Sequence, residues 1–222
     1  RSNIKIIWSN VPFTWKIAIR NIFREKKKFI FIGAAVAITC GLMMMTMWMN
    51  AIMDVMFVRH YTEFAKMEYN VGFNGFQDER VLNEIKENIS YNHMEGRIEL
   101  PFEIKNGRHS KIVNVIGLEG NTVFYDFHDI DGNKLTIPKD GIMLSSNLAN
   151  SLNAEIGDRI LMESFIPDRD GEYVTVKGIV EQSLGINGYM NINYVNRKFL
   201  DKRIINGVYI NSDDNVNLKL DN

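Results

Sequence analysis

The stretch between Lys28 and Asp54 contains 25 consecutive residues without a charged side chain. At about 1.5 Å per residue, a helix of this length extends roughly 37 Å, which exceeds the roughly 30 Å hydrocarbon core of a bilayer. Only two threonines and one asparagine interrupt the run, so it lacks the polar stripe of a helix in the core of a soluble protein. We therefore predict one transmembrane helix over residues 29–53.

Charge is distributed unevenly on the two sides of this run. Residues 1–28 hold eight Lys or Arg and one acid, a net +7, whereas residues 54–222 hold eighteen Lys or Arg and 26 acids, a net −8. Basic residues next to a span stay on the cytoplasmic side. This predicts a protein of the cell (plasma) membrane with a cytoplasmic N-terminus and an extracytoplasmic C-terminal domain, whose acidic balance excludes a nucleic-acid partner.

The apolar run also differs from a cleaved signal peptide, whose apolar core has about 7 to 15 residues. The sole cysteine, Cys40, lies inside the run and follows a threonine, which does not favour lipidation. The outer part therefore contains no disulfide and must depend on an ordinary hydrophobic core. At roughly 165 residues it is large enough to form one.

Residues 1–28 are predicted to form a cytoplasmic segment with a basic amphipathic helix. Apolar and cationic side chains alternate there at helical spacing; the residues are Trp15, Ile19, Ile22 and Phe23 on the apolar face and Arg20 and Arg24 on the other. Pro12 suits the start of such a helix. We expect the helix to lie on membrane lipid at the inner surface, and contact with a cytoplasmic partner is the alternative.

Small residues recur every four positions within the predicted span, at Gly33, Ala37 and Gly41. They share one helix face, where small side chains allow a second helix to approach closely. The partner helix would come from another copy, from another protein or from a further part of the chain. The alternative is that these are incidental small residues on a lipid-facing helix.

The remaining sequence predicts an α+β domain over residues 67–222, joined to the span by a helical stalk over residues 54–66. Apolar runs and turn signals indicate strands at 69–76, 97–105, 111–118, 172–182 and 205–214, with a turn at Asp131-Gly132. A helix over 78–89 is expected to be capped by Asp78. A second helix over 145–153 is expected to be capped by Ser145 or Ser146 and to bury Leu148, Ala149 and Leu152.

The sequence offers no catalytic constellation. His60, His93, His109 and His128 are scattered without metal-ligand spacing, and we expect them at the surface. The acids of "YDFHDIDGN" do not match a calcium loop, so a hairpin turn explains them better than a metal site. Glu95 and Glu99 are expected on solvated faces. Without a P-loop, a GxSxG or an HExxH motif, we predict no catalytic residue, no metal, no cofactor and no enzymatic activity.

Two stretches together resemble the permease subunits of FtsX/MacB-type ABC transporters. "WKIAIRNIFREKKKFIFIGAAVAITCGLMM" is similar to the amphipathic helix and first span of that family. "DGIMLSSNLANSLNAEIGDRILME", followed by "YVTVKGIVEQ", is similar to its extracytoplasmic MacB-like core domain. The matching positions are Gly141, Ser145, Leu148, Ala149, Leu152, Gly157, Asp158 and Gly178.

The resemblance implies a non-enzymatic subunit that dimerises with a second permease copy or half and binds a cytoplasmic ABC ATPase. It would pass ATP-driven motion through its stalk to the outer domain, for export or mechanotransmission. Family members have at least four spans, so we expect this sequence to be a fragment. The rival hypotheses are a single-pass anchor for an outer ligand-binding or sensor module and, less favoured, an ectoenzyme.

Overall fold

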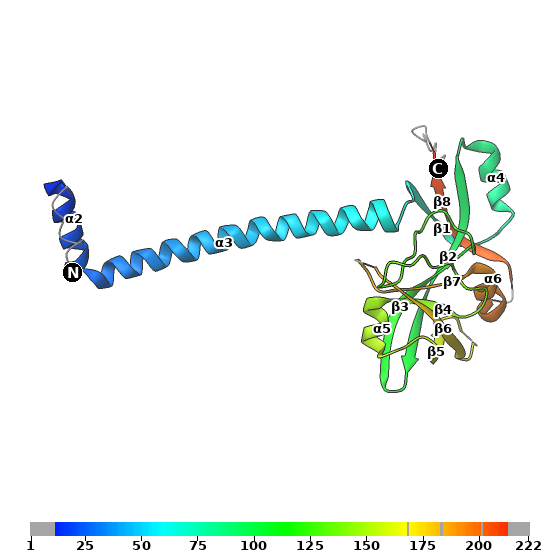
Figure 1. The fold of residues 1–222 in the computed structure, drawn as a ribbon. Helices are drawn as coiled ribbons and strands as arrows, with labels where there is room; N and C mark the ends of the chain where they lie inside the picture. The colour runs from blue at the N-terminus through cyan, green and yellow to red at the C-terminus, as the bar shows by residue number, and fades with distance from the viewer. Residues whose placement is uncertain (1–11, 168, 183, 201, 213–222) are drawn as a thin grey trace. The chain divides into compact units, whose positions relative to one another are not determined.

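The computed structural model describes residues 12–167, 169–182, 184–200 and 202–212. The chain forms two compact units, Arg1–Asp54 and Val55–Asn222. The first unit holds helix α2 (Phe13–Arg24) and most of helix α3 (Lys26–Val58), and the second holds all the named strands (Figure 1).

Helix α2 begins directly after Pro12, whose φ of −53° is compatible with a helix start. It ends at Glu25, where the backbone leaves the helical region, and α3 begins at the next residue. Helix α3 has 33 residues and a stretch with mean hydropathy 2.1. None of its side chains is buried, whereas the core helix of a soluble protein would bury many of them. The helix is long and apolar enough to cross a membrane.

The helical backbone continues past α3 as a six-residue π-helix, η1 (Arg59–Phe64). Its last turn closes when the backbone N–H of Ala65 donates to the carbonyl of His60 at 2.8 Å. Because wide turns of this kind are rare and concentrate at functional positions, the end of the helical run is a place to look for function.

The second unit is a mixed α+β domain built on an eight-stranded sheet. Its strands are β1 (Tyr69–Asp78), β2 (His93–Asn106), β3 (His109–Leu118), β4 (Ile142–Ser145), β5 (Arg159–Ser164), β6 (Glu172–Val180), β7 (Asn187–Asn191) and β8 (Ile204–Asn211). Its other elements are helices α4 (Val81–Asn88), α5 (Ser146–Leu152) and α6 (Ile192–Val195) and a second π-helix, η2 (Asn196–Leu200). The predicted fold class, an α+β domain behind one long apolar helix, is confirmed.

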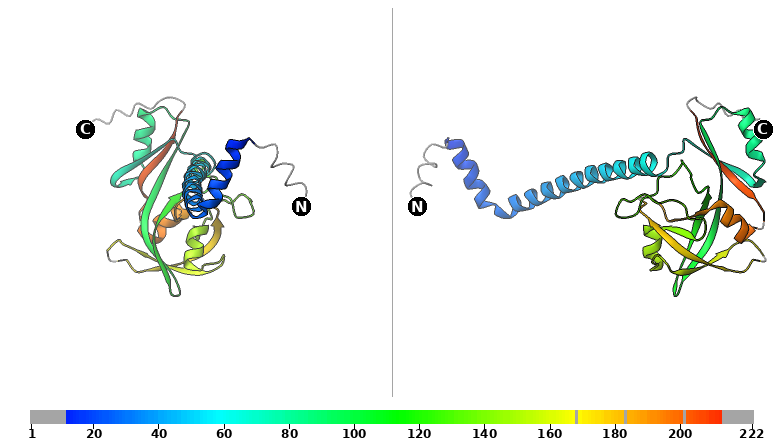
Figure 2. Two further views of the ribbon diagram at one scale, coloured as in Figure 1. Left: turned by 90° about the vertical axis from the view of Figure 1, so that its left-hand side faces the viewer. Right: turned by 45° about the vertical axis from the view of Figure 1, so that its right-hand side comes forward.

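Strand β2 organises the sheet, whose strand order is β1-β8-β2-β3-β7-β4-β6-β5. Its first half, from His93 to Arg97, pairs with β8, and its second half pairs with β3 on one edge and β5 on the other. The additional β2–β5 pairing closes six strands into a barrel, from which β8 and β1 extend. Figure 2 shows β2 as the long green strand that runs through both parts.

Two hydrophobic clusters fill the domain. The larger one lies inside the barrel, where Leu148 and Leu152 of α5 are fully buried. The smaller one gathers aromatic side chains around Phe64, at the end of η1. This smaller cluster also contains residues of β3, β4, β7 and β8, so the end of the helical run packs into the core of the domain.

Several sequence predictions of local structure are confirmed. Ser145 caps α5, since its Oγ accepts from the backbone N–H of Leu148 at 3.4 Å. The turn at Asp131-Gly132 is present, with Gly132 at a φ of +83°. The cap assigned to Asp78 is wrong: α4 begins after Arg80 without a side-chain cap, and the Asp78 carboxylate instead folds a local turn by accepting from the Arg80 backbone at 2.9 Å.

The sequence reading missed β7, α6 and η2. Strand β7 has the sequence "NGYMN", in which two asparagines and a glycine conceal a strand of five residues. It is nevertheless central, because it lies parallel to β3 and antiparallel to β4.

Gly141 provides a test of how tightly the barrel is closed. Its φ is +87°, and an added Cβ would lie 2.6 Å from the carbonyl oxygen of Thr175 and 2.5 Å from Cγ of Lys177. We expect Gly141→Ala to destabilise the domain by about 3 kcal/mol, because backbone strain adds to overpacking. Chemical unfolding of the detergent-solubilised chain measures this.

The matched control is Gly132→Ala, at a φ of +83° with nothing within 4 Å of the added Cβ. It carries the strain alone and should cost about 1 kcal/mol. Equal costs at the two positions would contradict the close approach of β6 to Gly141.

Candidate functional site

The candidate site is the junction where the helical run enters the domain, and all of it lies within the second unit. The chain after η1 is fixed by backbone hydrogen bonds to the segment around Tyr125. The N–H of Lys66 donates to the carbonyl of Phe124 at 2.8 Å, and the N–H of Asp126 donates to the carbonyl of Phe64 at 3.0 Å. With Phe64 and Ala65 only 7% and 5% exposed, the end of the helical run is part of the core.

Four aromatic rings from three separate stretches of sequence meet at this junction. Phe64 contacts Tyr125, Phe127 and Tyr189, with ring centroids 5.6, 5.7 and 6.0 Å away and edge-on geometry. Tyr125 and Phe127 stack in parallel at 5.4 Å. Such pairs contribute roughly 0.5–1.5 kcal/mol each beyond the burial of their area, so the junction is held by several contacts at once. We call these four rings the junction cluster.

The tyrosine hydroxyls of the cluster are neutral hydrogen-bonding groups. The hydroxyl of Tyr125 lies 3.1 Å from that of Tyr209, and the hydroxyl of Tyr189 donates to Oε1 of Gln182 at 3.0 Å. Burial raises the pKa of all three tyrosines. They therefore keep their protons at neutral pH and act by packing and hydrogen bonding.

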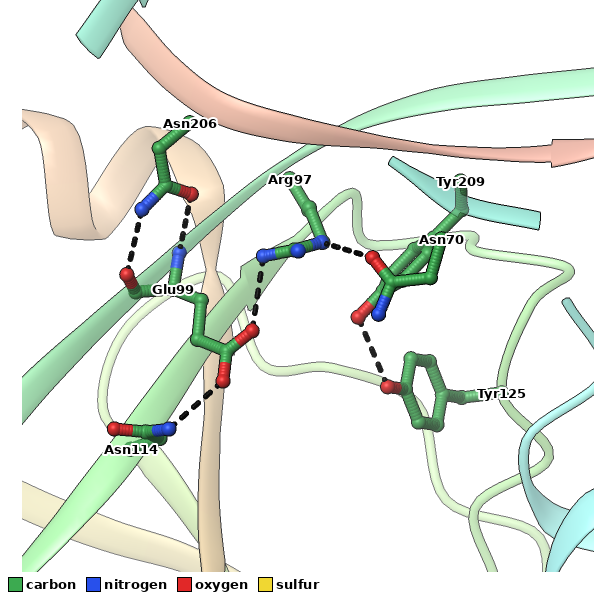
Figure 3. Close-up of polar contacts among 7 residues, drawn as sticks. All are labelled: Asn70, Arg97, Glu99, Asn114, Tyr125, Asn206 and Tyr209. Atoms are coloured by element: carbon green, nitrogen blue, oxygen red, sulfur yellow. Dashed lines mark hydrogen bonds and ion pairs between the residues drawn. The ribbon is translucent and has the colours of Figure 1, made fainter. Parts of the chain in front are cut away.

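An ion pair between the buried Arg97 and the half-buried Glu99 lies next to Tyr209 and connects the sheet extension, formed by β1 and β8, with the barrel (Figure 3). The Arg97 guanidinium donates to Oε2 of Glu99 and to Oδ1 of Asn70, both at 2.9 Å, and its Cζ lies 5.3 Å from the Tyr209 ring centroid. Asn70 belongs to β1, so this arginine joins β1, β2 and β8. Because the buried guanidinium of Arg97 has its acceptors in place, it avoids the cost of an unpaired buried charge.

The Glu99 residue of this pair is held on three sides. Its carboxylate accepts from Nδ2 of Asn114 at 2.8 Å, and its backbone N–H and carbonyl are bonded by the Asn206 side chain at 2.9 and 2.7 Å. Since Asn114 is on β3 and Asn206 on β8, Glu99 ties the barrel to the sheet extension. The side chain of Glu99, which was expected on a solvated face, is 30% exposed.

Glu95, also expected on a solvated face, is 6% exposed. Its carboxylate accepts from the backbone N–H of Glu119 at 2.7 Å and from the Thr122 side chain. Burial raises the pKa of Glu95 to about 7, although these hydrogen bonds oppose the rise. It fixes the loop after β3, which leads to Tyr125 and the junction cluster.

The acidic loop "YDFHDIDGN" is explained by local contacts. Asp126 forms ion pairs with Lys66 at 2.9 Å and Lys134 at 3.0 Å, and hydrogen bonds from these two lysines lower its pKa to about 2. Asp129 accepts from Asn133 and so closes its own turn. In the described ranges, no group of three His, Cys, Asp or Glu side chains is placed to hold a metal ion.

The predicted surface histidines differ from one another in the structure. His93 and His109 are exposed and His128 is half-buried. His60, which is also half-buried, packs against Tyr61 and Phe64 with ring centroids 5.0 and 5.6 Å away, and burial lowers its pKa. It belongs to the junction rather than to a free surface.

The residues matched by the family resemblance shape the barrel around α5. The Ser145 hydroxyl also accepts from the Asn187 backbone at 3.2 Å, which ties the start of α5 to β7. Gly157, at a φ of +101°, and Asp158, whose carboxylate accepts from the Glu155 backbone at 2.9 Å, form the turn before β5. The other matched residues pack against their neighbours. Gly141 lies against β6, and Gly178 lies against Met143. Leu148, Ala149 and Leu152 are buried.

The remaining predicted positions lie in the first unit. Gly33, Ala37 and Gly41 are exposed on α3, and nothing within the described ranges lies within 4 Å of an added Cβ at either glycine. Trp15, Arg20 and Arg24 are exposed on α2. The side chains of Ile19, Ile22 and Phe23 lie outside the described residues.

Comparison with known proteins gives similarity in fold without close similarity in sequence. No family model matches the chain, and no curated protein matches it. The extracellular domain of the noncanonic ABC-type transporter YknZ from Gram-positive bacteria is similar, with 12% identity, a TM-score of 0.49, and coverage of 65% of this chain and 82% of that one.

The periplasmic region of MacB from Actinobacillus actinomycetemcomitans is similar with 17% identity and a TM-score of 0.46. That match covers 66% of this chain and 74% of the MacB chain. At these identities the likeness concerns the fold.

The buried carboxyl of Glu95 predicts a pH dependence of stability. Because its pKa is raised from 4.5 to about 7 on folding, the folded chain binds more protons than the unfolded chain between these values. Stability should therefore fall as the pH rises from about 4.5 to about 7, by at most about 3 kcal/mol. Glu95→Gln keeps an acceptor for the Glu119 N–H and should remove this slope in urea unfolding of the full chain.

The control for this measurement is Glu155→Gln, which changes an exposed carboxyl. It should leave the pH dependence as in the parent chain. A slope that persists in Glu95→Gln would show that another group causes it.

Proposed function

We propose that this chain is the first spanning helix and the extracytoplasmic domain of an ABC transporter permease of the FtsX/MacB type. In this role it transmits ATP-driven motion from a cytoplasmic ATPase to the outer domain, for export or mechanotransmission. The observation that carries the proposal is the unbroken helical backbone from Lys26 to Phe64, whose last residue is buried in the junction cluster.

Transmission of motion requires a connection that does not absorb it. A flexible linker would behave as a random coil and take up small displacements. Here the helical backbone ends at Phe64, whose carbonyl accepts from the backbone N–H of Asp126. Two residues later, the backbone N–H of Lys66 donates to the carbonyl of Phe124. Both ends of this short segment are therefore held by backbone hydrogen bonds. The junction cluster then carries any displacement of the helix end into the barrel through Tyr189 on β7.

The location and partners of the protein follow from the same proposal. Helix α3 crosses the plasma membrane, α2 lies on the lipid of the inner surface, and the N-terminus is cytoplasmic. The basic residues before α3 support this orientation. The partners are a cytoplasmic ABC ATPase and a second permease copy or half, and ATP hydrolysis occurs in the ATPase.

The experiment loosens the junction while leaving the helix intact. In the full-length permease with its ATPase, Phe64→Ala removes a buried ring and should cost about 3 to 4 kcal/mol in unfolding of the outer domain. We expect the ATP-dependent change in the distance between spin labels at Lys111 of two copies to disappear. ATPase binding should remain, because the change is outside the cytoplasmic segment.

The matched control is Phe57→Ala. Phe57 is 45% exposed and stacks on Tyr61 at 6.2 Å, on the helix itself. The spin-label response should persist in this variant. A response that also persists in Phe64→Ala, with the ring gone, would contradict transmission through the junction cluster.

The small-residue face of α3 predicts how the permease assembles. Gly33→Leu or Gly41→Leu should reduce cross-linking between spanning helices in membranes, because a large side chain prevents close helix approach. Ala34→Leu is the control, since it adds the same bulk at a position outside the 33, 37, 41 face. Equal cross-linking in all three variants would remove this face as the contact.

The second candidate function is a single-pass anchor for an outer ligand-binding module. It is favoured by polar hollows on the domain around α4 and α6. The two functions differ in the reading frame beyond residue 222: further spans beside an ATPase gene support the permease, whereas a stop at that point supports the anchored module.

A further inference from the structure

Three adjoining hollows lie on the outer domain, the first and third beside α6 and the second beside α4; Figure 1 labels both helices. Their volumes are about 430, 450 and 540 Å³. The first and second hollows share Arg203, the second and third share Glu79 and Glu119, and the first and third share Asn193. Because their walls are shared, the hollows form one continuous depression, which we call the α6 groove.

One end of the α6 groove is basic. Among the residues that the structure describes, the first hollow is lined by Arg197, Lys202 and Arg203 together with two asparagines. Arg197 lies over the ring of Tyr194, with its Cζ 5.7 Å from the centroid. In the part of the chain that the structure describes, neither Lys202 nor Arg203 has an ion-pair partner. Three exposed cations in one concave site attract an anionic group more strongly than isolated surface charges do.

The other end of the α6 groove is acidic. The third hollow is lined by Glu79, Glu119 and a single base, Lys139. The wall at Glu119 is fixed, because its backbone N–H is bonded to the buried carboxylate of Glu95 at 2.7 Å. This part of the wall is therefore held in place. The charges that line the groove differ in sign between the first and third hollows, and the second hollow is lined by acids and bases alike.

This separation of charge decides between ligand classes. A phosphate polymer would gain at Arg203 and be repelled at Glu79 and Glu119. A polypeptide can carry acidic side chains at one end and basic ones at the other. Side-chain amides such as those of Asn193 and Asn196 can both donate to and accept from peptide groups.

We propose that the α6 groove binds an extended segment of a partner protein, with the acidic end of the segment at Arg197, Lys202 and Arg203. The contacts are electrostatic and exposed, so binding should weaken with salt. This site is separate from the junction cluster and does not require the chain to be a permease.

The test measures binding to the full chain in nanodiscs of phosphatidylcholine, which has no net charge. The probe is a fluorescein-labelled peptide with glutamates at one end, lysines at the other and a flexible polar middle. We expect saturable binding that weakens about tenfold in Lys202→Glu/Arg203→Glu. A composition-matched peptide with alternating charges should bind more weakly to the parent chain.

The matched control is Arg108→Glu/Lys111→Glu, which makes the same change in net charge at the exposed β2–β3 hairpin. It should bind the probe as the parent chain does. Unchanged unfolding midpoints in both variants confirm that the domain remains folded.

Four results would overturn the proposal. The first is the absence of saturable binding, and the second is an equal loss in the two double variants, which indicates bulk charge. The third is equal affinity for the two peptides. The fourth is competition by inorganic polyphosphate as effective as by the peptide, which would indicate a site for anionic polymers. None of these measurements involves an ATPase, so their failure is distinguishable from failure of the permease proposal.

Discussion

Burial of the Phe64 ring against Tyr125, Phe127 and Tyr189 is the contact on which the rest of the domain depends. It brings together the end of the helical run, the long connection between β3 and β4, and the barrel strand β7. That connection has no named helix or strand, so its aromatic side chains must supply its packing. Removing Phe64 would therefore loosen the connection as well as the helix end.

A polar layer extends this cluster into the upper part of the sheet. The hydroxyl pair of Tyr125 and Tyr209 reaches β8, and Arg97 beside Tyr209 reaches β1 and Glu99 (Figure 3). Every one of these side chains has a hydrogen-bond partner, and the tyrosines remain neutral. Such a network constrains geometry more than it adds stability, because desolvation offsets much of the gain from each pair. It suits a part that must move as one piece.

The sequence predicted the features that depend on local pattern. The apolar composition of α3, the Ser145 cap and the turn at Asp131-Gly132 are properties of neighbouring residues, and the structure contains all three. The junction cluster depends on residues far apart in sequence, and hydrophobic periodicity carries no information about such contacts. Burial of Glu95 was missed for the same reason, since the Glu119 loop that covers it follows a different strand. The Asp78 cap failed because its carboxylate formed a tighter local turn.

The central claim is that the helical run and the domain share one core at Phe64, and amide hydrogen exchange on the full chain in detergent tests it most directly. The Lys66 and Asp126 amides are bonded to Phe124 and Phe64. If the junction is part of the core, these amides exchange as slowly as those of the barrel strand β2. Rapid exchange at both positions while β2 remains protected would show that the helix end is loosely attached, and would contradict the account.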